Sequence, residues 1–216
     1  MNKIKKFLDK HAGMLLMLFY LVGFIGFNIP QTSRQFYMLT PVTLILSLIL
    51  LFYFHTPVNI KFILIALFIA FAGFFIEVVG VHSGLLFGAY VYGDTLGIKV
   101  FDTPLMIGLN WLMLAYCTYV FSQRLGANMW LRSLLGAFLM TVYDIVLEPV
   151  AIHSGMWTWE NGDVPLQNYM AWFVFSFLFH IILNLFKVRI ENKIASPLFK
   201  IQFVFFLILT LVITIF

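Results

Sequence analysis

The amino-acid sequence predicts an all-α integral membrane protein with about seven transmembrane helices. Of its 216 residues, 62% are hydrophobic and only 10% are charged, whereas a typical soluble domain is about a quarter charged. Apolar runs of about 20 residues, the length that crosses a bilayer, recur along the whole chain. These runs show no alternation of polar and apolar residues, which favours helices over a transmembrane β-barrel.

We treat the chain, residues 1–216, as a single transmembrane domain. Its Lys-rich start could begin a signal peptide, but no small-residue cleavage site follows the first apolar run, so we expect this run to remain as a helix. The predicted spans cover residues 12–28, 36–54, 60–80, 104–122, 130–149, 168–187 and 197–216.

The positions of the basic residues predict how these spans are oriented. With the N-terminus in the cytoplasm, only Arg34 and Lys99 of the 13 Lys and Arg residues lie outside. Cytoplasmic loops carry such an excess of positive charge. We therefore expect a protein of the bacterial cytoplasmic (inner) membrane with its N-terminus inside and its C-terminus outside. The long connections 81–103 and 150–167 then face outward.

The composition also excludes some classes of partner and site. The net charge of +4 does not indicate nucleic-acid binding, because the basic residues lie at span edges and form no stripe with interleaved aromatic residues. Cys117 is the single cysteine and lies inside an apolar run, so the sequence contains no disulfide framework and no thiolate metal cluster. The expected partners are the lipid bilayer and a lipophilic substrate, and the oligomeric state stays open.

Aromatic residues are frequent in the two outer connections. The segment Val81–Gly93 is apolar but too short to cross the membrane. We expect it to lie in the interface or to fold back into the bundle, with Tyr90 and Tyr92 at the depth of the lipid headgroups. By default, Trp157 and Trp159 are interface anchors as well.

An internal duplication surrounds these two connections. The segment Glu77-Val-Val-Gly-Val-His-Ser-Gly recurs as Glu148-Pro-Val-Ala-Ile-His-Ser-Gly. After each connection, a Pro-Leu pair precedes a tryptophan, Trp111 or Trp172, by the same number of residues. The two Glu residues lie 71 positions apart, which corresponds to two membrane crossings, so the repeats run parallel.

The duplication predicts how the core is built. We expect two halves, about 60–122 and 130–187, to form a four-helix core around a pseudo-two-fold axis. The spans 12–28, 36–54 and 197–216 are expected to be peripheral. A stripe of small residues on the third span would permit close helix packing, and it consists of Ala66, Ala70, Gly73 and Gly80.

Three carboxyl groups lie toward the outer ends of the core spans. Asp144 and Glu148 are four residues apart and share one face of a helix, and Glu77 is the repeat counterpart of Glu148. A carboxylate at a helix centre costs about 2.5 to 3.5 kcal/mol on insertion scales, so such groups face the bundle interior and usually serve a function. The alternative is that acids at helix ends simply reach headgroup water. The duplication favours Glu77 and Glu148 facing one cavity.

Carboxyl groups in an aromatic-lined pocket are suited to general acid catalysis, in which one donates a proton and a neighbour accepts one. Aromatic faces stabilise a carbocation by about 2 kcal/mol or more when it is desolvated. This chemistry describes an enzyme that adds a proton to an alkene, with or without the addition of water. It requires no cofactor and no metal.

Other polar residues have simpler interpretations. His180 belongs to an inward-facing ladder with a four-residue step on the sixth span, and we expect it to pack by hydrogen bonding to a neighbouring helix. His82 and His153 leave a metal site as an alternative, although no HxxH or HxxxH spacing is present. Ser83 and Ser154 lack the strand-turn-helix context of a nucleophilic serine.

Five segments cover about half of the chain, roughly residues 70–175, and they are Glu77–Gly93, Pro104–Trp111, Asp144–Pro149, Trp157–Trp159 and Val164–Trp172. Together they resemble the carotenoid biosynthesis proteins of the CruF type, which are membrane carotenoid 1,2-hydratases. The chain departs from the family pattern where Glu148 precedes a proline, a position that often holds Asp, and at Ser83, where Thr is frequent.

The resemblance implies cofactor-independent hydration of the terminal C1,C2 double bond of an acyclic carotenoid end group, of the lycopene or γ-carotene type, to a tertiary alcohol. Asp144 and Glu148 are then the expected acid and water-positioning pair, with Glu77 as their counterpart. Residues expected to bind the polyene or shield the cation are Asn110, Trp111, Tyr143, Trp172, Asn168, Tyr90, Tyr92, Trp157 and Trp159.

Two other functional classes remain open from the sequence. A carotenoid cyclase or isomerase begins with the same protonation but excludes water from the cation, and only its product would distinguish it. A proton-coupled transporter could relay protons along acids, His180 and Asn184. The clustering of polar groups toward the outside, with no continuous path inward, argues against this class.

Overall fold

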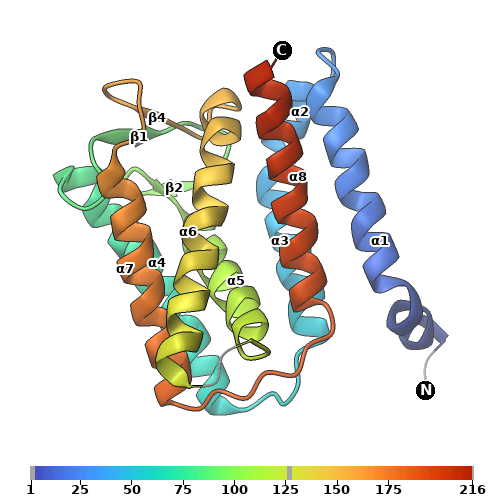
Figure 1. Ribbon diagram of the computed structural model, residues 1–216. Helices are drawn as coiled ribbons and strands as arrows, with labels where there is room; N and C mark the ends of the chain where they lie inside the picture. The colour runs from blue at the N-terminus through green and yellow to red at the C-terminus, as the bar shows by residue number, and fades with distance from the viewer. Residues whose placement is uncertain (1–2, 126–127, 216) are drawn as a thin grey trace.

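The computed structural model describes residues 3–125 and 128–215, and the last position of the predicted span 197–216 lies outside this range. The helices run side by side as one bundle, with the two chain ends at opposite ends of it (Figure 1). The elements, in order, are α1 (Lys3–Asn28), α2 (Ser33–Met38), α3 (Thr40–Tyr53), α4 (Ile60–Ser83), β1 (Tyr90–Tyr92), β2 (Lys99–Val100), β3 (Thr103–Pro104), α5 (Leu105–Ser122), α6 (Met129–His153), β4 (Trp157–Trp159), α7 (Leu166–Leu185) and α8 (Ala195–Ile215).

The helical membrane fold predicted from composition is confirmed. Within the described ranges, six helices are long and apolar enough to cross a membrane, namely α1, α4, α5, α6, α7 and α8. The predicted span 36–54 differs, because α2 ends at Met38 and α3 begins at Thr40. Pro41 lies in the first turn of α3, where its missing N–H is tolerated, whereas in a continuous helix its ring would clash with the preceding turn. Helix α3 has 14 residues and is about 21 Å long.

Packing follows the two halves of the duplication. Helix α4 packs against α5, and α6 packs against α7, while α5 also contacts α6. Almost every residue of α5 is buried, which makes this helix the centre of the bundle. Helix α8 packs against both α5 and α6, and α1 packs against α8. The carboxyl-terminal helix therefore contributes more to the interior than the duplication alone predicts.

The small residues of α4 lie where α5 approaches most closely. A Cβ at Gly108 would lie 2.5 Å from the Ala70 carbonyl oxygen, and a Cβ at Gly73 would lie 2.6 Å from the Cβ of Trp111. Both approaches place the backbone of one helix against its neighbour. The glycines thus allow α4 and α5 to pack at a distance that any side chain would increase.

We expect Gly108→Ala to destabilise the protein, because the added methyl group meets backbone that cannot move aside without separating the helices. Overpacking of this kind costs about 1–3 kcal/mol, and alanine recovers about 1 kcal/mol of helix propensity at most. The measurement is the midpoint of thermal unfolding in detergent. Gly13→Ala is the matched control, since a Cβ there meets nothing within 4 Å. Equal midpoints for the two variants would contradict this packing.

Two short antiparallel strands cover one end of the core. Strand β1 pairs with β4 in the register Tyr90↔Trp159, Val91↔Thr158 and Tyr92↔Trp157. Because strands β1 and β4 occupy equivalent positions in the duplication, this antiparallel pairing fits a pseudo-two-fold axis through the central pair. Side chains alternate, so the outer residues of each strand are buried and the central ones are exposed. Tyr90, Tyr92, Trp157 and Trp159 are therefore buried against the bundle, which agrees with a segment that folds back into it and not with side chains that project outward as anchors.

The repeated His-Ser-Gly sequences end helices α4 and α6. Gly84 and Gly155 have φ values of +64° and +69°, the left-handed conformation that glycine adopts readily at a helix end. The hydroxyl groups of both serines donate back to carbonyls of their own helices, as Ser154 does to Val150. Part of the duplicated motif is therefore a helix-termination signal.

Candidate active site

Glu77 is buried at the end of α4 beneath the strand pair. Its Oε2 accepts hydrogen bonds from the hydroxyl groups of Tyr90, at 2.5 Å, and Tyr92, at 2.8 Å. Its Oε1 accepts one from Trp111 Nε1 at 2.9 Å. Burial, and then the charge of Glu77, raises the pKa of each tyrosine well above its usual value of 10. Both tyrosines therefore keep their protons and remain donors to Glu77.

Glu148, on α6, is surrounded in the equivalent way. Its Oε2 accepts hydrogen bonds from Trp157 Nε1 at 2.9 Å and from Trp159 Nε1 at 3.1 Å. Its Oε1 accepts a longer one, 3.3 Å, from the Asn168 side-chain amide at the start of α7. Because all of its partners are donors, Glu148 is held as a hydrogen-bond acceptor, as Glu77 is.

The aromatic rings of the two halves meet between these acids. Tyr90 donates a hydrogen bond to Glu77 and Trp159 donates one to Glu148. The centroids of these two rings are 5.0 Å apart. On the side toward the membrane centre, Trp111 stacks on its repeat counterpart Trp172, with ring centroids 4.0 Å apart and planes inclined by 13°. The two glutamates thus lie on either side of a column of aromatic rings. Aromatic rings of both halves therefore occupy space between the two acids, where the sequence predicts a shared cavity.

Asp144 breaks this pseudo-symmetry. It lies one turn from Glu148 on α6, it is 1% exposed, and its Oδ2 accepts a hydrogen bond of 2.8 Å from Asn168. Its Oδ1 is buried without a hydrogen-bond partner among the described residues. At the equivalent position α4 has Gly73, where a side chain would collide with Trp111. The second half of the chain therefore carries a carboxyl group that the first half has no room for.

Asn168 ties the two acids of α6 together. Its single amide nitrogen donates to Asp144 and to Glu148, so one side chain sets the separation of both carboxyl groups. Asn168 itself is buried and held in the first turn of α7, where its backbone N–H bonds to the Pro165 carbonyl. This arrangement is suited to passing a proton between two neighbouring carboxyl groups.

The ladder of polar residues on α7 faces the bundle interior, as its four-residue step predicts. His180 is fully buried, donates from Nδ1 to the Ser176 carbonyl at 2.7 Å, and has Nε2 3.0 Å from the Thr118 hydroxyl on α5. Asn184 bonds to Ser133 on α6. His180 therefore has the interhelical hydrogen bond that the packing interpretation requires.

The two other candidate histidines lie outside the carboxyl cluster. His82 Nε2 is 3.6 Å from the exposed Asp102, and the ring of His153 contacts the ring of Tyr37. Within residues 3–125 and 128–215, no group of three or more His, Cys, Asp or Glu side chains is arranged to hold a metal ion.

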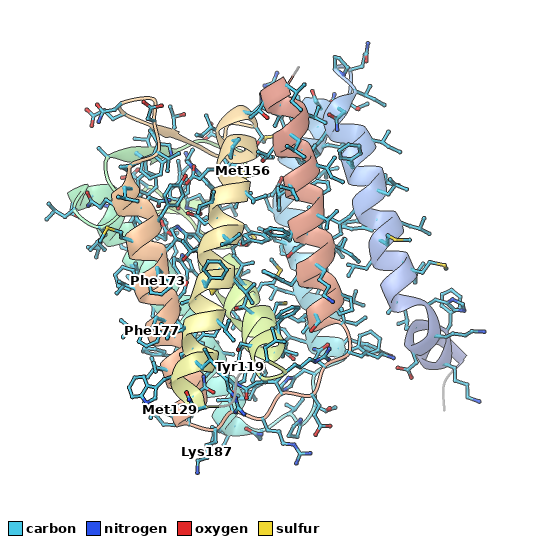
Figure 2. All side chains as sticks on the ribbon, in the orientation of Figure 1. Tyr119, Met129, Met156, Phe173, Phe177 and Lys187 are labelled. Carbon is cyan, nitrogen blue, oxygen red and sulfur yellow. The ribbon has the colours of Figure 1, made fainter. Side chains whose placement is uncertain are left out.

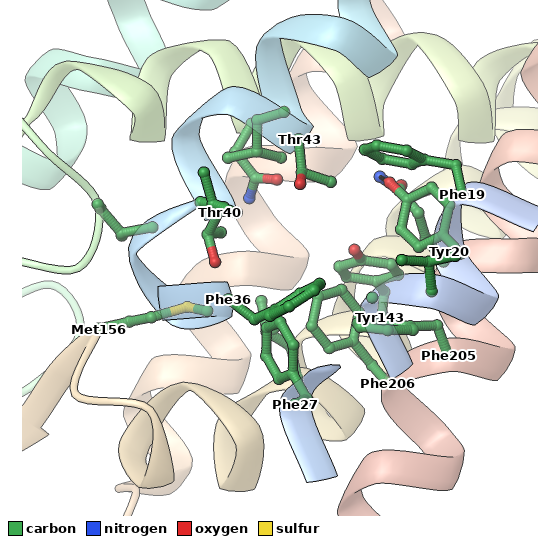
Figure 3. Close-up of a pocket in the computed structure, with 18 of the residues that line it drawn as sticks. Phe19, Tyr20, Phe27, Phe36, Thr40, Thr43, Tyr143, Met156, Phe205 and Phe206 are labelled. Atoms are coloured by element: carbon green, nitrogen blue, oxygen red, sulfur yellow. Dashed lines mark hydrogen bonds between the residues drawn. The ribbon is translucent and has the colours of Figure 1, made fainter. Parts of the chain in front are cut away.

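A separate pocket lies beside the cluster, between α1, α3, α5, α6 and α8 (Figure 3). Its cavity volume is about 140 Å³, and most of its lining is aromatic or aliphatic. Trp157 belongs to both sites, since its ring lines the pocket and its N–H donates to Glu148. The pocket therefore adjoins the carboxyl cluster across one aromatic side chain.

The structure divides the residues expected to contact a substrate into two sets. Asn110, Tyr143 and Trp157 line the pocket. The others surround the acids, either by hydrogen bonds or by the tryptophan stack, and are Tyr90, Tyr92, Trp111, Trp159, Asn168 and Trp172. Sequence reasoning missed the pocket residues of the remaining helices, such as Tyr20, Thr43 and Gln202. The sequence signal for these pocket residues is the presence of a few polar residues in spans that are otherwise apolar.

Parts of the chain are similar in sequence to known proteins. Residues 37–216 match a family described as "Carotenoid biosynthesis protein". Among curated proteins, the chain is similar to the bisanhydrobacterioruberin hydratase of Haloarcula japonica, with 31% identity over 105 residues. The match covers 45% of this chain and 36% of that relative, so about a third of the relative's length is matched. No solved structure matches the chain.

Proposed function

The chain belongs to the family of carotenoid biosynthesis proteins, and from this premise we propose that it is a membrane enzyme that hydrates an acyclic carotenoid end group. The proposed reaction adds water across the terminal C1,C2 double bond and gives a tertiary alcohol at C1. A relative named as a hydratase supports the reaction class. The observation that carries the proposal is the buried Oδ1 of Asp144, which has no hydrogen-bond partner among the described residues and lies beside a second carboxyl group.

The three acids are suited to different roles. Asp144 has one oxygen free of any partner in the described structure, so it can present a proton to an alkene carbon. Glu148 accepts three hydrogen bonds, yet its Oε1 has only one of them, at 3.3 Å. A carboxylate oxygen has two acceptor sites, so this atom can also accept a proton from water. Glu77 is enclosed by Tyr90, Tyr92 and Trp111, which suits a supporting electrostatic role.

The proposed steps balance without a cofactor. Asp144 transfers its proton to C2, the π bond supplies the electron pair of the new C–H bond, and a tertiary cation forms at C1. Water forms the C–O bond at C1 and loses a proton to Glu148. That proton returns to Asp144 through the neighbouring pair that Asn168 holds together. Aromatic faces and the charge of the carboxylates stabilise the cation.

Expression in a bacterial host that accumulates lycopene tests this function. We expect carotenoids heavier by one or two waters, with hydroxyl groups at C1. A cyclase or isomerase would leave the mass of the carotenoid unchanged. A product with altered absorption and unchanged mass would therefore contradict hydration and support a cyclase or isomerase. Unchanged lycopene, with the protein folded in the membrane, would contradict both.

We further propose that the carboxyl cluster faces the outside of the bacterial cytoplasmic membrane. Lys187 and Met156 mark opposite ends of the bundle in Figure 2, and the connection from α7 to α8 that holds Lys187 also holds Arg189 and Lys193. The positive-inside rule places the Lys187 end in the cytoplasm. A carotenoid is about as long as the bilayer is thick, so its end would reach the acids near external water.

Cysteine labelling of intact cells tests this orientation. We expect a membrane-impermeant maleimide to label Glu160→Cys from outside and to label Arg189→Cys only after the membrane is opened. Both positions are exposed, and the native Cys117 is buried and should not react. The reverse pattern would overturn the proposed orientation.

A further inference from the structure

The pocket beside the carboxyl cluster contains polar groups that the fold leaves without partners. Thr40 and Thr43 come from α3, Asn110 from α5 and Tyr143 from α6. Figure 3 shows the hydroxyl groups of Thr40, Thr43 and Tyr143 directed toward the open space of the pocket. None of the four side chains has a hydrogen-bond partner in the part of the chain that the structure describes.

These four side chains are buried to different degrees, since Thr40 and Thr43 are only partly buried, although the Oγ1 atom of Thr40 is fully enclosed. Tyr143 is 2% exposed and Asn110 is 9% exposed. A buried polar group without a partner loses the hydrogen bonds that it makes with water in the unfolded chain, and most such groups in native proteins have a partner. Four polar side chains without partners around one space indicate that a ligand or water supplies the missing hydrogen bonds.

The rest of the lining shows that the ligand is largely apolar. Phenylalanine rings from α1, α2 and α8 surround the polar groups, including Phe27, Phe36, Phe205 and Phe206. The cavity volume of about 140 Å³ far exceeds the 10–15 Å³ that one water needs. Apolar walls with a few converging polar groups are typical of sites for small organic ligands. A hydroxyl group can both donate to and accept from Asn110, Tyr143 and the threonines.

We propose that this pocket binds the hydroxyl-bearing end of an isoprenoid chain, as a tertiary alcohol. The identity of this alcohol as the reaction product rests on the proposed function. Trp157 separates the pocket from Glu148, so the alcohol formed at the acids has a binding site one side chain away. The polar groups hold the new hydroxyl, and the phenylalanine rings hold the methyl groups and the chain behind it.

Competition photolabelling tests the proposal on the full-length protein in lipid nanodiscs. The probe is a saturated C10 isoprenoid tertiary alcohol that carries a diazirine, and the competitors are the same alcohol without diazirine and the alkane of the same skeleton. We expect labelled peptides from 19–27 or 202–206, which line the pocket, and a competitor preference for the alcohol of about tenfold or more.

Variants test whether the polar groups of the pocket cause its preference for the alcohol over the alkane. Tyr143→Phe, Asn110→Leu and Thr43→Val are each expected to reduce the alcohol preference severalfold while labelling by the probe persists. The matched controls are Tyr37→Phe and Thr141→Val, because Tyr37 lines a neighbouring cleft and the Thr141 hydroxyl bonds to Ala137 on its own helix. Both controls should keep the wild-type preference.

The outcomes separate this proposal from the proposed function. Equal competition by alcohol and alkane, or labels confined to α4 and α7, would overturn the alcohol site and would show that water alone satisfies the polar groups. The probes have no double bond and cannot be hydrated, so this result does not depend on turnover. A retained alcohol preference in a protein that fails to hydrate lycopene would overturn the reaction and leave the binding site supported.

Discussion

Asp144→Asn is expected to reduce hydration by at least about a hundredfold, the lower scale for loss of a general acid, while the protein remains folded in the membrane. The amide has the shape of the carboxyl group, and its oxygen can still accept the hydrogen bond from Asn168. It cannot donate a proton to an alkene carbon. The measurement is the rate at which hydroxylated carotenoid forms in membranes that contain equal amounts of protein.

Asp163→Asn is the matched control for this variant, since it makes the same chemical change at an exposed position of the outer connection. We expect it to retain the wild-type rate. Near-normal hydration by Asp144→Asn would remove Asp144 from the proposed proton transfer, even if the product of the reaction were the expected alcohol.

Glu148→Gln is expected to reduce hydration by a similar factor, but at a later step. The glutamine oxygen can still accept hydrogen bonds from Trp157 and Trp159, so we expect the strand pair to remain in place. The amide nitrogen cannot take a proton from water. Asp144 can still protonate the alkene, and the cation can still lose a proton and return to alkene. Capture of the cation by water becomes slow.

Incubation in D2O distinguishes the two variants. Substrate recovered from Glu148→Gln is expected to contain deuterium near the terminal double bond, and substrate recovered from Asp144→Asn is expected to contain none. Glu160→Gln, an exposed change of the same kind, should hydrate at the wild-type rate. If Glu148→Gln shows neither exchange nor hydration, the two acids cannot have the separate roles assigned to them.

The helices could be predicted from the sequence because their signal is long and local. Six of the seven predicted spans correspond to helices long enough to cross a membrane. The exception is the span 36–54, which is interrupted because a new helix begins at Thr40, with Pro41 in its first turn. The inward face of α7 followed from a four-residue step that extends over the whole span. Helical periodicity of this length outweighs the local preferences of single residues.

The strand pair shows what the sequence alone could not reveal. Tyr90-Val91-Tyr92 and Trp157-Thr158-Trp159 each alternate, but three residues are too few to distinguish a strand from an aromatic interface segment. Their pairing joins segments that are far apart in sequence, and only the pairing turns the rings toward Glu77 and Glu148. The acids could therefore be identified from their duplication, whereas their donors could not.

The pocket was missed for a related reason. Isolated polar residues in apolar helices, such as Thr43 in α3 and Gln202 in α8, predict nothing about which helices meet. Asn110 and Tyr143 were identified as candidates, but their separation from the acids by Trp157 depends on how α5 and α6 pack with α1, α3 and α8.

Gly73 occupies the position in the first half that corresponds to Asp144 in the second half. This difference between the halves has a consequence for a substrate with two equivalent ends. One chain has a single set of acids able to complete the proposed reaction, because the other half lacks the carboxyl group that Asp144 provides. In that reaction, a linear carotenoid that spans the bilayer would present one terminus to that set at a time. To convert the second terminus it must leave, turn around in the lipid and return. The enzyme should therefore work distributively, with the singly hydrated compound accumulating in the membrane before the doubly hydrated one.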